Sequence, residues 1–131
     1  MNRDGLEPER RSDGDEDGQA ALELALALPI VVVLLLALVQ VTVVVRDQVA
    51  TIHAAREAAR AAAATGAGTG DGMAAGQAAT SLDAGRLTVK VTRGDVVRAT
   101  VTYRSATDVP LVGRLIGDVV VQASAVMRPE P

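Results

Sequence analysis

The chain lacks several residue types, and each absence excludes a class of structure or chemistry. Its 131 residues include no cysteine, no tryptophan and no phenylalanine, and Tyr103 is the only aromatic residue. The absence of cysteine excludes disulfides, thiolate metal sites and cysteine nucleophiles. A core of Val, Ala, Leu and Ile buries less apolar area per residue than one that contains large rings. We therefore expect a small domain of marginal stability, with Tyr103 packed on a sheet face.

Signals of catalysis and ligand binding are also missing. His53 is the only histidine, and we interpret it as a helix-surface side chain because no metal or catalytic partners converge on it in the sequence. Gly66–Gly72 contains four glycines, but the Gly-Lys-Ser/Thr end of a phosphate loop does not follow, so we interpret it as a flexible linker. Asp83, Asp95 and Asp118 fall singly at predicted turns or strand edges, where carboxylates are usually solvated. The sequence thus predicts no enzyme, no cofactor and no metal site.

Charge is distributed unevenly along the chain. Residues 1–18 carry three basic and seven acidic side chains, a net charge of −4, and residues 19–131 carry +1, which together give the total of −3. We expect residues 1–18 to be a disordered acidic leader, because a segment with high charge, Gly and Pro and one large apolar residue cannot form a core. The remainder has no basic cluster, which argues against nucleic-acid binding.

A long apolar run follows the leader. Leu24–Val45 contains 22 residues without a charge and only two polar side chains, Gln40 and Thr42. As a helix this run is about 33 Å long, enough for the hydrocarbon core of a bilayer, so residues 19–45 are predicted to form a transmembrane helix. A signal peptide would have a shorter apolar run and a positive leader. Arginines are equally numerous on both sides, so the positive-inside rule does not decide the orientation.

The rest of the chain changes from helical to strand periodicity. Residues 46–64 are rich in Ala, Arg, Glu and Gln and continue the helix. Residues 65–85 form a Gly/Ala-rich linker in which Met73–Leu82 is a short helix. Residues 86–131 form a small β-rich domain, and its strands are predicted at Leu87–Thr92, Val97–Tyr103 and Asp118–Arg128. The predicted fold class is α+β: a long N-terminal helix, membrane-spanning in its first half, and a small antiparallel β-sheet packed on its outer half.

One constellation at the start of the helix is specific. Gly18 ends the charged leader, Glu23 lies five residues later, Ala25-Leu26 follows, and Pro29 precedes a poly-aliphatic stretch. This spacing resembles the processing site of the type IV pilin superfamily. Within that superfamily the chain looks like the TadE-like family of minor pseudopilins from bacterial tight-adherence (Flp-type) pilus systems. The Ala-Ala-Arg segment after the run and the closing segment Ala123–Arg128 also resemble family features.

The resemblance implies a function and a set of partners. A prepilin peptidase would cut after Gly18, so that Gln19 becomes the N-terminus and Glu23 the fifth residue. Glu23 would then pair with an N-terminal amine and set the register between subunits, and Pro29 would remove one hydrogen bond of the helix. The implied partners are other pseudopilins or the major pilin, the inner-membrane assembly platform and the lipid bilayer. The N-terminus would be cytoplasmic and the C-terminal domain extracytoplasmic.

A second hypothesis belongs to a different class of protein. The chain would be an uncleaved, single-pass membrane anchor whose outer domain recognises a partner in the cell envelope. The N-terminal residue of the mature protein distinguishes the two hypotheses.

Overall fold

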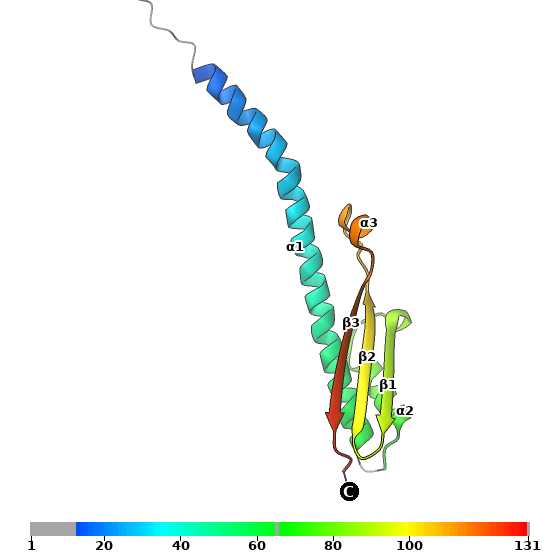
Figure 1. Ribbon diagram of the computed structural model, residues 1–131. Coiled ribbons are helices and arrows are strands. Elements are labelled where there is room, and N and C mark those ends of the chain that lie inside the picture. Colours follow the sequence, from blue (N-terminus) through cyan, green and yellow to red (C-terminus); the bar gives the residue numbers. More distant parts are fainter. Residues whose placement is uncertain (1–12, 65, 131) are drawn as a thin grey trace, which may run out of the picture. The chain divides into compact units, whose positions relative to one another are not determined.

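The computed structural model describes residues 13–64 and 66–130, and it confirms the predicted α+β fold (Figure 1). Contacts divide the chain into two units, one that ends at Leu35 and one that begins at Leu36. The helices are α1 (Asp13–Ala63), α2 (Thr69–Ala78), the short 3₁₀ helix η1 (Ala84–Arg86) and α3 (Val112–Ile116). The strands are β1 (Leu87–Arg93), β2 (Val97–Ser105) and β3 (Val119–Met127).

The first unit consists of the N-terminal part of α1. The helix begins at Asp13, six residues before the predicted start at Gln19, so residues 13–18 are helical although they were predicted to be disordered. Carboxylates are favourable in the first turn of a helix because they complement its dipole, and this segment is rich in Asp and Glu. Residues 1–12, the rest of the predicted leader, lie outside the described residues.

The second unit is built on a three-stranded antiparallel sheet with the strand order β1-β2-β3. In its register Val89 lies opposite Val101, and Val101 lies opposite Ala123. The three strands begin and end within two residues of the predicted positions. In β1 and β2 the signal is the alternation of apolar and polar residues, which marks a strand that is buried on one face only. Tyr103 lies in the core, and His53 is exposed, as predicted.

The inner face of the sheet packs on the C-terminal half of α1. The helix contributes six buried alanines, which we call the alanine stripe: Ala54, Ala55, Ala58, Ala59, Ala62 and Ala63. Val101 at the centre of β2 is fully buried in this core together with Ala99, and Val97 packs with Ala62 and Ala63. Small side chains at spacings of three and four residues bring the helix axis close to the strands.

Helix α2 corrects one prediction. The segment Gly66–Gly72 was predicted to be a flexible linker, but α2 begins at Thr69 and ends at Ala78. A Cβ atom on Gly72 would lie 2.7 Å from the carbonyl oxygen of Ala58, and one on Gly76 would lie 2.9 Å from the Cβ of Ala58. These two glycines, four residues apart, are therefore packing positions at which the backbone of α2 approaches α1 closely. They were mistaken for turn residues because glycine is usual in both places.

The second unit also begins earlier along α1 than predicted. Gln40 and Val44 fall within the predicted transmembrane segment, residues 19–45, yet Gln40 is buried and Val44 packs against the core. The C-terminal part of the apolar run therefore has one side against the domain.

Candidate processing and assembly site

The residues of the predicted processing site lie together on the first part of α1. Gly18 is helical and has open space around its Cα, with no atom within 4 Å of the position that a Cβ would occupy. Gln19 and Glu23 are both exposed, and the Gln19 Nε2 donates a hydrogen bond to the Glu23 Oε1 at 3.3 Å. Residues four apart share a helix face, so Glu23 points along the same side of the helix as the residue that would become the N-terminus.

Pro29 lies inside α1. Its ring removes the N–H that would bond to the carbonyl of Ala25, four residues earlier, and thereby weakens the helix locally. Pro29, Ile30, Val33 and Leu34 line a shallow apolar hollow of about 290 Å³. Pro29 thus interrupts the hydrogen bonding of the helix six residues after Glu23, beside this apolar hollow.

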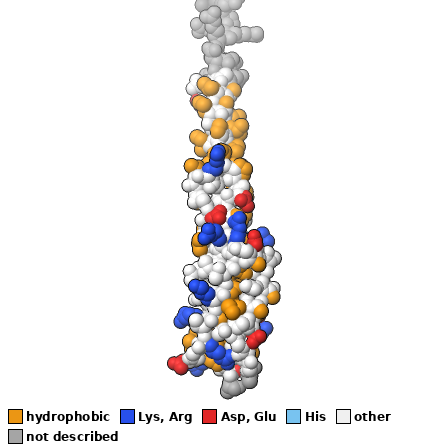
Figure 2. Space-filling view, turned by 90° about the vertical axis from the view of Figure 1, so that its right-hand side faces the viewer, with side chains coloured by type: hydrophobic (Ala, Val, Ile, Leu, Met, Phe, Trp, Pro, Cys, Tyr) orange, Lys and Arg blue, Asp and Glu red, His pale blue; other side chains and the backbone are white. Residues whose placement is uncertain are grey.

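Residues 24–35 of the first unit present only apolar side chains, and all of them are exposed. The segment Gly18–Ala63 of α1 contains an 18-residue window that is apolar enough to cross a membrane, and only 6% of that window is buried. Figure 2 shows hydrophobic side chains gathered on the N-terminal stretch of α1 and charged side chains on the second unit. A helix in the core of a soluble domain would be mostly buried. This exposed, apolar helix near the N-terminus instead suggests a single-pass membrane anchor.

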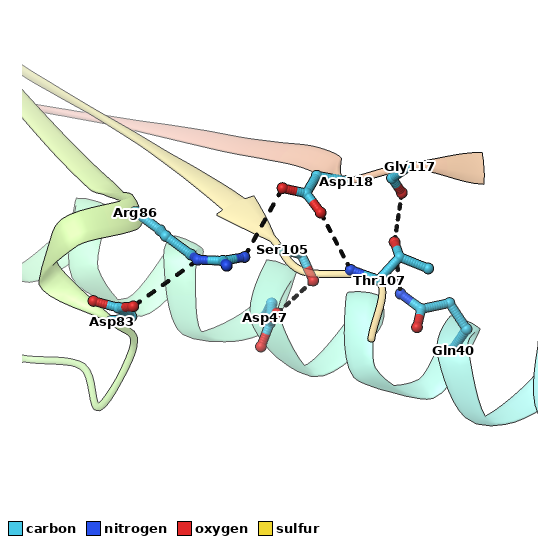
Figure 3. A network of polar contacts seen from close by, with 8 residues as sticks. All are labelled: Gln40, Asp47, Asp83, Arg86, Ser105, Thr107, Gly117 and Asp118. Atoms are coloured by element: carbon cyan, nitrogen blue, oxygen red, sulfur yellow. Dashed lines mark hydrogen bonds and ion pairs between the residues drawn. The ribbon is translucent and has the colours of Figure 1, made fainter. Parts of the chain in front are cut away.

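A buried row of polar contacts, missed in the sequence, joins α1 to the sheet (Figure 3). Asp47 is 6% exposed, and its Oδ2 accepts a hydrogen bond of 2.6 Å from the Ser105 hydroxyl. The Gln40 Nε2 donates to the Thr107 hydroxyl at 3.3 Å, and that hydroxyl donates to the Gly117 carbonyl at 2.5 Å. We call Gln40, Asp47, Ser105 and Thr107 the polar seam. It fixes how far α1 can slide or rotate against β2.

A sequence signal for the seam exists. Gln40, Asp47, Thr51, Ala54 and Ala58 follow one another at intervals of seven, four, three and four residues, so they lie on one face of the helix. No partner was predicted for the polar members of that face. Only the pairing with β2 shows that the polar side chains are part of the interior.

The outer face of the sheet carries a different set of side chains. Lys90, Arg98 and Arg104 are exposed there, and the three strands place no carboxylate on this face. An open hollow of about 450 Å³ lies beside Arg86 and Arg104. Arg86 is already engaged by Asp83 and Asp118, each at 3.9 Å. The two carboxylates lie near turns, as expected, and Asp83 also caps η1 by accepting from the Gly85 N–H.

Within residues 13–64 and 66–130, no three His, Asp or Glu side chains are grouped in a way that could hold a metal ion. The absence of enzyme activity and of a cofactor stays a prediction.

Comparison with known proteins supports the resemblance seen in the motif. A family model described as TadE-like protein matches residues 18–60, from the predicted cleavage position to the alanine stripe. Searches of curated proteins and of solved structures give no match. The family match and the long apolar helix together fit a membrane protein associated with Tad pili. Residues 18–60 are thus similar to the TadE-like family, and the resemblance predicted from the sequence is confirmed over this segment.

Proposed function

We propose that the protein is a minor pseudopilin-like subunit of a tight-adherence (Flp-type) pilus assembly or secretion system. In this proposal a prepilin peptidase cleaves after Gly18, the N-terminus faces the cytoplasm, and the sheet domain lies outside the cytoplasmic membrane. The observation that carries the proposal is the position of Gly18, Glu23 and Pro29 at the start of an apolar helix that the described residues leave almost wholly exposed, inside the TadE-like match. Such a helix requires lipid or neighbouring helices around it.

Cleavage changes the electrostatics of the helix start. The new α-amine of Gln19 would lie about one helical turn from the Glu23 carboxylate, because the two residues are four apart. A carboxylate at the edge of the membrane is costly unless it is paired. The amine of the same chain or of a neighbouring subunit neutralises it, and the subunits then align at a fixed register. The Gln19–Glu23 hydrogen bond shows that this carboxylate is accessible from the preceding turn.

The helical state of the cleavage site has a consequence for processing. α1 runs through the bond between Gly18 and Gln19 without a break. A peptidase that reaches this carbonyl must first unwind the turn that precedes it. Glycine lowers the cost of unwinding because it gains more backbone freedom than any other residue outside a helix. We propose that Gly18 serves both as the residue recognised at the cut and as the weak point of the helix.

The mature N-terminus is the direct test of processing. Mass spectrometry of the protein recovered from its native membrane is expected to show a chain that begins at Gln19. The variant Gly18→Leu should keep Met1, because a bulky side chain blocks cleavage, whereas the control Gly14→Leu, in the leader, should be processed normally. A Gly18→Leu protein of normal mature size would contradict the assigned site.

The role of Glu23 is tested by assembly. Glu23→Ala and Glu23→Gln should both insert into the membrane and both lose the pulldown of other pilin-like subunits, because each removes the charge. Glu57→Ala, on the exposed side of the same helix, is the matched control and should assemble normally. Unchanged pulldown with Glu23→Gln would refute the pairing with an amine.

The alternative is an uncleaved anchor that carries an envelope-binding domain. The cationic outer face of the sheet, Lys90, Arg98 and Arg104, is the observation that favours it, since this face suits an anionic partner. A mature protein that retains Met1 would support this alternative over the pseudopilin proposal.

A further inference from the structure

The connection between β2 and β3 exposes large apolar side chains that the proposed function does not use. Leu111, Leu115 and Ile116, which we call the apolar tip, all face solvent, and Leu115 is 84% exposed, more than any other large apolar side chain described. Figure 1 shows α3 beyond the ends of β2 and β3, at the opposite end of the sheet from the turn between β1 and β2. Three exposed large apolar side chains in one short segment contribute nothing to the stability of a soluble domain.

The base of the connection is held by hydrogen bonds to α1 and to Asp118. Thr107 is bonded to Gln40 of α1 through its hydroxyl, and its N–H donates to the Asp118 carboxylate. Within the connection, the Gly113 N–H donates to the Val109 carbonyl, and the Gly117 N–H donates to the Gly113 carbonyl. These bonds satisfy backbone groups that would otherwise be costly in an apolar medium.

The tip is built on a strained backbone. Leu111 is the only described non-glycine residue with a positive φ, 69°, a conformation that a bulky side chain rarely adopts. A Cβ on Gly113 would collide with the Thr107 carbonyl oxygen, so only glycine fits where these two segments of the connection approach each other. Strain of this kind persists where the surroundings over-determine the conformation, and it marks candidate functional segments.

The connection lies against the end of the apolar run. A largely apolar hollow of about 370 Å³ is lined by Leu36, Val39 and Val43 of α1 and by Val109 and Pro110 of the connection, with Gln40 and Asp108 also on its wall. Leu36, Val39 and Val43 belong to the last ten residues of the uncharged run Leu24–Val45. The connection therefore lies beside the C-terminal end of the run, where a membrane-spanning helix of this length would leave the hydrocarbon core.

From these observations we propose that the apolar tip is a second membrane contact, which seats Leu111, Leu115 and Ile116 at the boundary between headgroups and acyl chains on the side of the sheet domain. The proposal rests on the membrane anchor of the proposed function. α1 alone leaves the domain free to rotate about the helix axis, and a second contact on one side of that axis removes this freedom. The sheet domain would then present a fixed face to neighbouring subunits.

The charges around the tip determine which lipids it requires. Asp108, Arg114 and Asp118 give the connection a net charge of −1. An anionic surface therefore does not attract it, and burial of the apolar side chains must supply the binding. The contact is expected in vesicles of phosphatidylcholine alone and is expected to be insensitive to salt.

The absence of cysteine allows a direct test with single labels. The full chain is prepared with Leu115→Cys, Val33→Cys or Val96→Cys, labelled with an environment-sensitive fluorophore, and reconstituted in phosphatidylcholine vesicles with or without lipids that carry a quencher. Val33 lies in the anchor, and Val96 is an exposed apolar residue in the turn between β1 and β2. Labels at positions 33 and 115 should lose fluorescence to the lipid quencher, and the label at position 96 should not.

The outcomes separate this proposal from the anchor on which it rests. Lipid quenching at position 33 but not at 115 refutes the membrane contact of the tip and leaves the anchor intact. No lipid quenching at position 33 refutes the anchor and the tip together. A label at 115 that is shielded from aqueous iodide only at high protein density, without lipid quenching, means that a second protein chain covers the tip, and this also refutes the proposal.

A variant controls for the effect of the label. Leu111→Asn with Ile116→Asn should abolish lipid quenching of the label at position 115, while the fluorescence of the buried Tyr103 stays unchanged and the unfolding midpoint does not fall, because both replaced side chains are exposed. Retained quenching in this variant would show that the apolar tip does not hold the contact.

Discussion

The two halves of α1 differ in the size of their side chains and in what those side chains contact. In the first unit Leu24, Leu26, Ile30 and Leu34 are exposed, and no part of the described chain covers them. In the second unit the alanine stripe is buried against the sheet and α2. One helix thus supports two kinds of contact. Large aliphatic side chains suit an apolar medium or other helices, and small side chains let a folded domain approach the helix backbone.

The difference also determines where substitutions are tolerated. In the second unit, alanine and glycine residues set the distance between the backbones of α1 and its neighbours. A larger side chain has no space there, so even a small increase in side-chain volume should lower the free energy of unfolding. In the first unit the medium around the helix is fluid or supplied by partners, so equal changes in volume should leave the domain unaffected. Tyr103 is the only aromatic residue and is buried in the core, so its fluorescence reports on the second unit alone.

The largest effect is expected when a large side chain enters the alanine stripe. Ala58 is fully buried and lies where both Gly72 and Gly76 approach α1. Ala58→Leu should destabilise the second unit by about 3 kcal/mol or more, because the added atoms have no space. Urea unfolding in detergent micelles, followed by Tyr103 fluorescence, measures this change.

Leu34→Ala, in the first unit, is the opposite exchange and should leave the midpoint of the Tyr103 transition unchanged. A shift of the midpoint as large as that of Ala58→Leu would contradict the distinction between the two halves of α1.

The packing glycines of α2 should show a smaller effect of the same kind. Gly72→Ala places a methyl group 2.7 Å from the backbone oxygen of Ala58 and should cost about 2 kcal/mol. Gly70→Ala is the matched control: it lies in the same helix with open space around it and should stabilise the unit by up to about 1 kcal/mol through helix propensity. If both variants stabilise the unit, α2 does not pack as described.

These glycines show why part of the fold could not be predicted from the sequence. The strands were found because alternation in Leu87–Thr92 and Val97–Tyr103 is a local signal that burial on one face produces directly. The role of Gly72 depends on Ala58, which precedes it by 14 residues, and no local rule distinguishes a glycine that gives room to a neighbour from one that breaks a helix. The structure of α2 is therefore decided by tertiary contact.

The functional residues also differ in whether they could be recognised from the sequence. Gly18, Glu23 and Pro29 could be proposed from the sequence because a processing site is a linear motif, and the TadE-like match begins at Gly18. Asp47 and the apolar tip were missed. A carboxylate within a polar stretch of helix looks solvated until its partner on β2 is known, and Leu115 looks like a core residue until α3 is placed.

The polar seam offers a more moderate test of the second unit. Asp47→Ala leaves the buried Ser105 hydroxyl without its acceptor and should cost about 1 to 2 kcal/mol. Asp47→Asn keeps an acceptor of the same shape and should cost less. The double variant Asp47→Ala with Ser105→Ala should be less unstable than the sum of the two single variants, because no buried group is then left unpaired. Strict additivity of the two changes would mean that the hydrogen bond contributes nothing.

The smallest effect is expected at Thr51, although it is fully buried. Its hydroxyl donates to the Asp47 carbonyl at 2.7 Å, but that carbonyl belongs to the helix ladder and keeps its backbone partner when the hydroxyl is removed. Thr51→Val preserves the shape and leaves no acceptor unsatisfied, so the Tyr103 transition should move by less than about 0.5 kcal/mol. Asp47 and Thr51 are one turn apart on the same buried face, so the contrast between them isolates one cause. On this face, the free energy lost depends on whether a substitution leaves a buried polar group without a hydrogen-bond partner. A loss at Thr51 as large as that of Asp47→Ala would show instead that burial of any polar side chain here stabilises the unit.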